Sequence, residues 1–266
     1  MIPQSSFIGI YVMIAFGVIL PLGVTIWWLR KSHDKIKTVL TGAATWFIFA
    51  VILEAIPKMF LLNPAKSIGR TILGNAALAT LVAALIAGIF EETGRLVAFK
   101  LVLNKEKNKE TSVSHGIGHG GFEALYLLGV SGVQYLSYAS MINAGKFQEL
   151  IDAAAAQGAD VSSLKALPQA LQSINALTSC FAGVERIFAM LLHVGLSILV
   201  FYAVKRSKGS LYFLAVLLHA LFDVPAALYQ FGIIKNVFVV EAMLAVYAIG
   251  FFIVVYKKLY SRDLNL

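Results

Sequence analysis

Ionisable side chains occur inside apolar stretches of this sequence, where charge is rare. They are Glu91, Glu92, Arg95, His115, His119, Glu123, Glu185, Arg186, His193, His219 and Asp223. Glutamate can activate water, and histidine can bind a metal ion or transfer a proton. Each charge in the middle of a bilayer costs roughly 2.5 to 3.5 kcal/mol, so these groups are expected to meet partners. Together they have the composition of a hydrolytic site.

The spacing of these residues puts acids and bases on the same helix faces. His119 and Glu123 are four residues apart, as are His219 and Asp223. Residues at this spacing lie about one turn apart on one face of a helix. Such a pair is either an internal salt bridge or a carboxylate that orients a metal-bound imidazole. The spacing alone leaves both interpretations open.

The elements that carry these residues are apolar helices. The chain has 266 residues, of which 59% are hydrophobic and 14% charged, whereas a soluble domain carries about 25% charged residues. This composition excludes an ordinary soluble protein. Apolar runs of about 20 residues predict seven membrane spans, near residues 6–29, 38–57, 72–99, 113–141, 178–204, 209–231 and 236–256. We therefore expect an all-α, polytopic helical bundle.

We expect one transmembrane domain over residues 1–266, with a catalytic core at about 72–231. The long connection at about 143–177 has apolar residues at helical spacing, for example Phe147 and Ile151, which predicts a short extramembrane helical hairpin. This hairpin is either a lid or a simple connector. The single cysteine, Cys180, excludes an internal disulfide and a site of paired cysteines.

The net charge of +8 comes from basic residues between the apolar runs. This distribution favours a topology signal over a nucleic-acid surface, so we expect a lipid bilayer and no nucleic acid as partner. Lys and Arg number 14 on one set of connections and 6 on the other. By the positive-inside rule, the N-terminus lies outside and the C-terminus in the cytoplasm.

Depth along the helices brings the ionisable groups to one level. At about 1.5 Å per residue, Glu92, His119, His219 and His193 lie roughly 12, 10, 15 and 18 Å from the cytoplasmic ends of their predicted helices. We therefore expect one site in the cytoplasmic half of the membrane. The glycines at 116, 118 and 121 occur among helices and predict close helix packing rather than nucleotide binding.

The chemistry of such a site has two versions. His119, His193 and His219 could hold one divalent metal such as Zn²⁺, with a glutamate as general base. The second version needs no metal, because a glutamate can activate water while histidines stabilise the oxyanion. No H-E-x-x-H motif occurs, which excludes a zincin-type protease.

Several motifs in order resemble the bacterial YhfC-type membrane proteins, relatives of the PrsW and CAAX/Abi intramembrane endopeptidases. They are Glu91-Glu92-Thr93-Gly94-Arg95, the run from Gly118 to Glu123, Glu185-Arg186 followed by His193, and His219 with Asp223. The resemblance covers roughly half the chain. It implies an intramembrane metallo- or glutamate-type protease in a bacterial plasma membrane, with a membrane protein or peptide as substrate.

The resemblance also implies roles for individual residues. Glu91 and Glu92 correspond to the double-glutamate motif that supplies the water-activating carboxylate, with Glu123 as a third catalytic acid. Arg95, Glu185, Arg186 and Asp223 are expected to pair charges. Spacing favours Arg95 beside Glu91, whereas the family pattern makes Glu91 the water activator and leaves Arg95 to Glu92; we favour the second.

Two other classes of function fit buried charges. An ion- or proton-coupled transporter also needs them along its path. A non-catalytic membrane scaffold could retain a polar core. A protease is the first expectation, because the motifs combine glutamate with several histidines.

Overall fold

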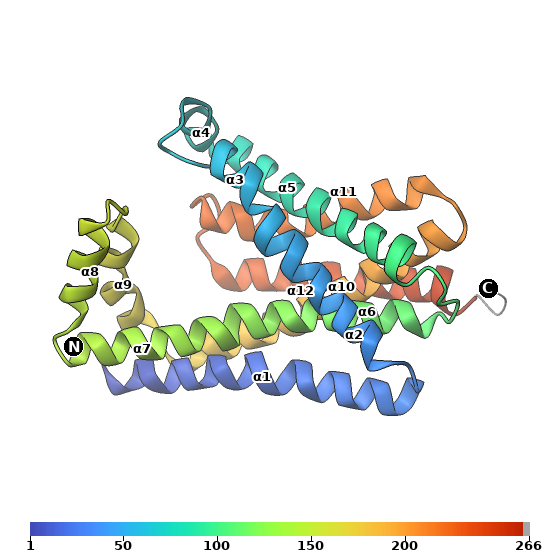
Figure 1. Ribbon diagram of the computed structural model, residues 1–266, viewed down its shortest axis with the longest axis horizontal. Coiled ribbons are helices and arrows are strands. Elements are labelled where there is room, and N and C mark those ends of the chain that lie inside the picture. Colours follow the sequence, from blue (N-terminus) through green and yellow to red (C-terminus); the bar gives the residue numbers. More distant parts are fainter. Residues whose placement is uncertain (263–266) are drawn as a thin grey trace. The chain divides into compact units, whose positions relative to one another are not determined.

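The computed structural model describes residues 1–262, which contain helices and no strands (Figure 1). The chain is an all-α, polytopic membrane protein, as the sequence predicted. The helices are α1 (Gln4–Ser32), α2 (Ile36–Trp46), α3 (Ala55–Leu61), α4 (Ser67–Leu73), α5 (Ala76–Val97), α6 (Glu110–Ala124), α7 (Ser131–Asn143), α8 (Phe147–Ala156), α9 (Ser162–Ser173), α10 (Ala176–Lys205), α11 (Gly209–Gln230) and α12 (Val237–Val255). Short π-helical segments are η1 (Phe47–Leu53), η2 (Ala98–Val102), η3 (Leu125–Val130) and η4 (Tyr256–Tyr260).

Six helical segments of the described chain are long and apolar enough to cross a membrane. They are Gln4–Ser32, Ile36–Leu61, Ala76–Val102, Ala176–Lys205, Gly209–Gln230 and Val237–Tyr260. Each coincides with a predicted span. Several are joined across π-helical segments, where the backbone widens by one residue per turn without leaving its internal hydrogen bonds unmade.

Of the seven predicted spans, six are long and apolar enough to cross a membrane within residues 1–262. The fourth predicted span, near 113–141, is helical through α6, η3 and α7. It is not among the six apolar segments, because His115, His119 and Glu123 fall in a stretch that is also rich in glycine and serine. The residues that could do chemistry thus lower the apolarity of their own helix.

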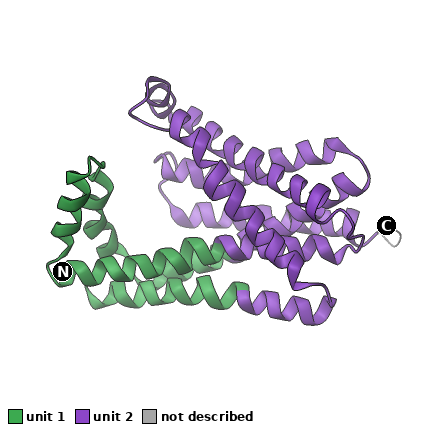
Figure 2. Cartoon of the chain, viewed as in Figure 1, with its two compact units in different colours: residues 1–21, 124–186 green, residues 22–123, 187–266 purple. Residues whose placement is uncertain are grey.

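The helices form two compact units, shown in different colours in Figure 2. The first contains residues 1–21 and 124–186, and the second contains residues 22–123 and 187–266, of which 263–266 are not described. The predicted single domain, with its core at 72–231, stays a prediction.

The first unit holds the predicted hairpin. Helices α8 and α9 lie within residues 143–177, where the sequence predicted two short helices. A small core of Ile2, Ile10, Ala139 and Leu171 ties the N-terminal segment to α7 and α9. The amide of Asn143 reinforces this core, since its oxygen accepts a hydrogen bond from the Ile2 backbone N–H at 2.6 Å.

In the second unit, α6 is a buried helix with neighbours on several sides. Every residue from 111 to 121 is buried. A methyl group built on Gly118 would lie 1.9 Å from the carbonyl oxygen of Val39 on α2, and one on Gly116 would lie 2.5 Å from the Cα of Val194 on α10. Only glycine permits these approaches. The close packing brings α6 side chains next to those of α5 and α10.

Candidate functional site

Four helices of the second unit supply a buried cluster of acids and histidines. Helix α5 carries Glu91, Glu92 and Arg95; α6 carries His119 and Glu123; α10 carries His193; α11 carries His219. Glu92, Arg95 and His119 are inaccessible to solvent. The ring centroids of His119 and His193 are 4.9 Å apart, and those of His193 and His219 are 5.5 Å apart. Three imidazoles therefore occupy one small region.

Glu91 lies between two of these imidazoles. Its Oε2 is 2.8 Å from Nε2 of His119, which is a hydrogen bond from the ring N–H to the carboxylate. The same oxygen is 3.9 Å from Nε2 of His219. Glu91 is 7% exposed, so its carboxylate is almost entirely surrounded by protein. This oxygen thus stands next to both α6 and α11.

Glu92 faces a different set of groups, because successive residues point about 100° apart around a helix. Its Oε1 accepts hydrogen bonds from the Arg95 guanidinium and, at 2.7 Å, from Nδ1 of His219. Since Nδ1 of His219 donates to Glu92, its Nε2 carries a lone pair in the neutral ring. Glu92 therefore fixes the orientation of His219 and leaves Nε2 free to act as a ligand or base.

Arg95 connects α5 to α10 at the centre of the cluster. Besides Glu92, its guanidinium donates to Nδ1 of His193 at 2.5 Å and to the Ser197 hydroxyl at 3.3 Å. Ser197 Oγ also lies 3.2 Å from Nδ1 of His115. Burying a charge is unfavourable unless it is paired and hydrogen-bonded, and Arg95 meets both conditions.

The contact with Arg95 fixes the tautomer of His193. A guanidinium can only donate, so Nδ1 of His193 accepts and the proton of the neutral ring is on Nε2. That nitrogen is 2.5 Å from Oε2 of Glu123, so the imidazole and the carboxylate are in contact. A chain of polar contacts thus runs from Glu92 through Arg95 and His193 to Glu123.

The donor atoms of Glu91, His193 and His219 lie within 4.8 Å of one another, all three buried. Two histidines and one glutamate are a common ligand set of catalytic zinc, with bonds of about 2.0 to 2.2 Å. Glu92 behind His219 matches the carboxylate that usually orients a metal-bound imidazole. His193 can act as a metal ligand once its Nε2 proton is displaced and the hydrogen bond from Arg95 to its Nδ1 is broken. On donor chemistry and orientation, the residues fit a divalent metal.

The three converging donors differ in one member from the three predicted histidines. His119 hydrogen-bonds Glu91 and belongs to the cluster, but Glu91 takes its place among the three converging donors. The change follows from side-chain direction: Nε2 of His119 points at a carboxylate oxygen. Which of these residues bind a metal remains a proposal.

The remaining predicted residues divide into two groups. Asp223 Oδ2 is 3.7 Å from Nε2 of His219, which makes it a peripheral charge of the cluster. Glu185 and Arg186 belong to the first unit, where the Arg186 guanidinium pairs with the Glu185 carboxylate. Each of these two residues therefore has an oppositely charged partner next to it in the sequence.

Two polar residues near the cluster are not among those that the sequence singles out. Ser197 bridges Arg95 and His115, yet a serine in an apolar helix carries little signal. Glu54 is 2% exposed, pairs with Lys58 one turn later, and is near enough for its charge to act on Glu91. An isolated acid near the end of the predicted span 38–57 is the signal that could have revealed it.

These features define a class: a polytopic α-helical membrane protein with a buried glutamate and histidine cluster able to ligate a metal. A family model described as YhfC intramembrane metalloprotease matches residues 16–244, and the chain belongs to this family. It is also 32% identical over 248 residues to "Uncharacterized membrane protein YhfC" of Bacillus subtilis (strain 168), which covers 93% of this chain and 94% of the relative. No solved structure matches the chain.

Proposed function

We propose that this protein is an intramembrane endopeptidase that hydrolyses peptide bonds of membrane-embedded substrates at the Glu91 cluster. The observation that carries the proposal is the convergence of Glu91, His193 and His219 within 4.8 Å in a buried layer. The family description, intramembrane metalloprotease, agrees with this chemistry. The apolar helices that carry the cluster suit a substrate that is itself within the bilayer.

Glu91 is the proposed water-activating carboxylate. Its Oε2 would accept a proton from water as the water oxygen bonds to the scissile carbonyl carbon, and would deliver that proton to the amine as the C–N bond breaks. The hydrogen bond from His119 holds this oxygen in place. The carboxylate is thereby preorganised for both proton transfers.

Glu92 and Arg95 are proposed as positioning residues. Glu92 holds His219 through Nδ1 and Arg95 holds Glu92; in the metal-free site Arg95 also holds His193. If Zn²⁺ is the metal, Glu91, His193 and His219 would hold it, and it would supply a Lewis acid that polarises the scissile carbonyl. In that case Glu91 would be a ligand rather than the base, and Glu123, in contact with His193, would be the carboxylate that accepts the proton.

The orientation predicted from the basic residues completes the proposal. With 14 basic residues on one set of connections, the N-terminus would lie outside and the site in the cytoplasmic half of a bacterial plasma membrane. Cleavage would then release the cytoplasmic part of the substrate.

The decisive experiment compares Glu91→Gln with the wild type in reconstituted vesicles. The amide keeps the shape of the carboxylate and removes the basic oxygen, so cleavage of a membrane-peptide library should stop while the protein stays folded and inserted. Glu149→Gln, the same change at an exposed position of α8, is the matched control and should keep full activity.

Elemental analysis of the same samples separates the two roles of Glu91. Loss of cleavage with the metal retained assigns it as the base, whereas loss of both assigns it as a ligand. Full cleavage by Glu91→Gln would overturn the proposed site. Ion flux through wild-type vesicles without any cleavage would instead favour a carrier.

A further inference from the structure

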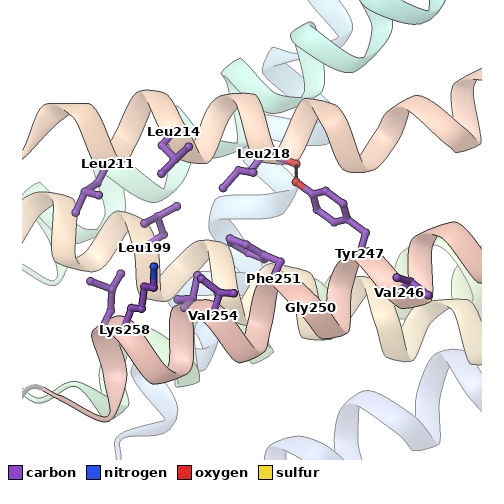
Figure 3. Close-up of a pocket in the computed structure, with 12 residues that line it drawn as sticks. Leu199, Leu211, Leu214, Leu218, Val246, Tyr247, Gly250, Phe251, Val254 and Lys258 are labelled. Carbon is purple, nitrogen blue, oxygen red and sulfur yellow. Dashed lines mark hydrogen bonds between the residues drawn. The ribbon is translucent and has the colours of Figure 1, made fainter.

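An elongated apolar groove lies between α10, α11 and α12 of the second unit, and no residue of the Glu91 cluster lines it. Its volume is about 530 Å³. Figure 3 shows the two facing rows of side chains from α11 and α12, with Leu199 of α10 between them. The lining residues are Leu199, Leu211, Leu214, Leu218, Val246, Tyr247, Gly250, Phe251, Val254, Val255, Lys258 and Leu259.

The size of the groove selects a slender occupant. Its lining on α12 and η4 extends from Val246 to Leu259, which is about 20 Å at 1.5 Å per residue. Its volume falls in the range of about 300 to 1,000 Å³ that holds single small molecules. A membrane-spanning helix, about 10 Å wide and 30 Å long, occupies on the order of 2,000 Å³. The groove therefore fits one hydrocarbon chain and is too small for a helix.

Charge is present at only one end of the groove. Lys258 is the one charged lining residue, and Figure 3 shows its side chain turned inward, toward Leu199. Its ammonium group makes no ion pair or hydrogen bond with any residue from 1 to 262. Lys257 is next to it in sequence. An ammonium group at the end of an apolar groove is complementary to an anionic head attached to an acyl chain.

The polar group at the opposite end is already satisfied. The Tyr247 hydroxyl donates to the backbone oxygen of Leu218 at 2.9 Å, drawn as a dashed line in Figure 3. Between Tyr247 and Lys258 the lining consists of hydrocarbon side chains and Gly250. A methyl group built on Gly250 would meet nothing within 4 Å, so the missing side chain leaves part of the groove open.

We propose that this groove binds one acyl chain of an anionic phospholipid, with the lipid phosphate held by Lys258. The groove length, its volume and its single terminal cation all match such a molecule. The bound lipid would contact α11, the helix that carries His219.

Native mass spectrometry after reconstitution with phosphatidylglycerol or phosphatidylcholine of identical acyl chains tests this proposal. The wild type should retain one phosphatidylglycerol per chain. Gly250→Phe should lose it, because the ring fills the groove. Gly23→Phe is the matched control: a methyl group built on this glycine of α1 would also meet nothing within 4 Å, but Gly23 lies outside the groove.

The charge is tested separately, in case filling the groove disturbs folding. Lys258→Gln should lower the preference for phosphatidylglycerol over phosphatidylcholine by about fivefold, since one lysine near the surface contributes about 1 kcal/mol toward an anionic lipid. Lys257→Gln, which changes a neighbouring cation that does not line the groove, should have a smaller effect.

The proposal is overturned if Gly250→Phe retains as much phosphatidylglycerol as the wild type, or if Gly23→Phe loses it equally. Retention of a peptide or of phosphatidylcholine in preference to phosphatidylglycerol would also overturn it. These outcomes are independent of whether the protein cleaves peptides.

Discussion

Replacing Arg95 by glutamine should strongly destabilise the protein. The guanidinium is inaccessible to solvent and contacts Glu92, His193 and Ser197. Without it, the Glu92 carboxylate stays buried and keeps only the hydrogen bond from His219. Removing one partner of a buried ion pair typically costs about 3 to 5 kcal/mol, because the other charge stays desolvated and uncompensated. We expect a loss of this size.

A double-mutant cycle separates the ion pair from simple packing. Glu92→Gln alone should also destabilise, since it leaves Arg95 without a carboxylate. The double variant buries neutral amides in place of two charges. Its loss should therefore fall below the sum of the single losses by about 1 to 3 kcal/mol, the usual coupling between residues in contact.

Chemical or thermal unfolding in one detergent measures all four proteins. The control is Arg70→Gln, which changes an exposed arginine that hydrogen-bonds the backbone oxygens of Pro64 and Ala65; its loss should be below about 1 kcal/mol. Strictly additive losses in the cycle, or a loss for Arg95→Gln no larger than that of Arg70→Gln, would refute the buried-pair reasoning.

Two further changes test the packing and the orientation. Gly118→Ala should destabilise the protein by about 1 to 3 kcal/mol, because the added methyl group would lie 1.9 Å from the Val39 oxygen and must push α2 away from α6. Gly23→Ala is the control and should change the stability little, because no atom lies within 4 Å of the added methyl group. Equal effects of the two changes would contradict the packing argument. A cysteine placed at Lys107, in a chain where Cys180 is first replaced by serine, should be protected from an impermeant reagent in intact cells. Labelling from outside would reverse the proposed topology.

The sequence was sufficient to predict most of the fold. The spans near 6–29, 178–204 and 236–256 needed only apolar length, and the structure has helices there. The hairpin at 147–173 followed from helical spacing of apolar residues. The fourth span shows that a count of membrane spans by apolarity alone can miss a helix. A helix buried among other helices can carry polar residues that lipid would not accept, and burial depends on tertiary packing.

The candidate site could be predicted from the sequence only in part, for the same physical reason. Spacing favoured Arg95 beside Glu91, but the structure pairs Arg95 with Glu92, three residues away, as the family pattern implied. Contacts between helices, such as Arg95 with His193, depend on rotation and depth that one sequence does not encode locally. The depth estimates brought the histidines to one layer, but they could not distinguish His119 beside a carboxylate from His119 as a ligand. The catalytic roles of all these residues stay predictions.

The burial of α6 has a consequence for how the protein is made. This helix carries His119 and Glu123 and, with its continuation in α7, falls outside the six segments apolar enough to cross a membrane. A translocon that sorts helices one at a time favours apolar segments, so α6 is less able than those six segments to enter lipid on its own. The helices α2 and α5 precede it in synthesis, and Val39 of α2 already offers a surface that fits Gly118. We expect α6 to be inserted against these earlier helices, so that His119 meets Glu91 of α5 before α10 and α11 add His193 and His219 to the cluster.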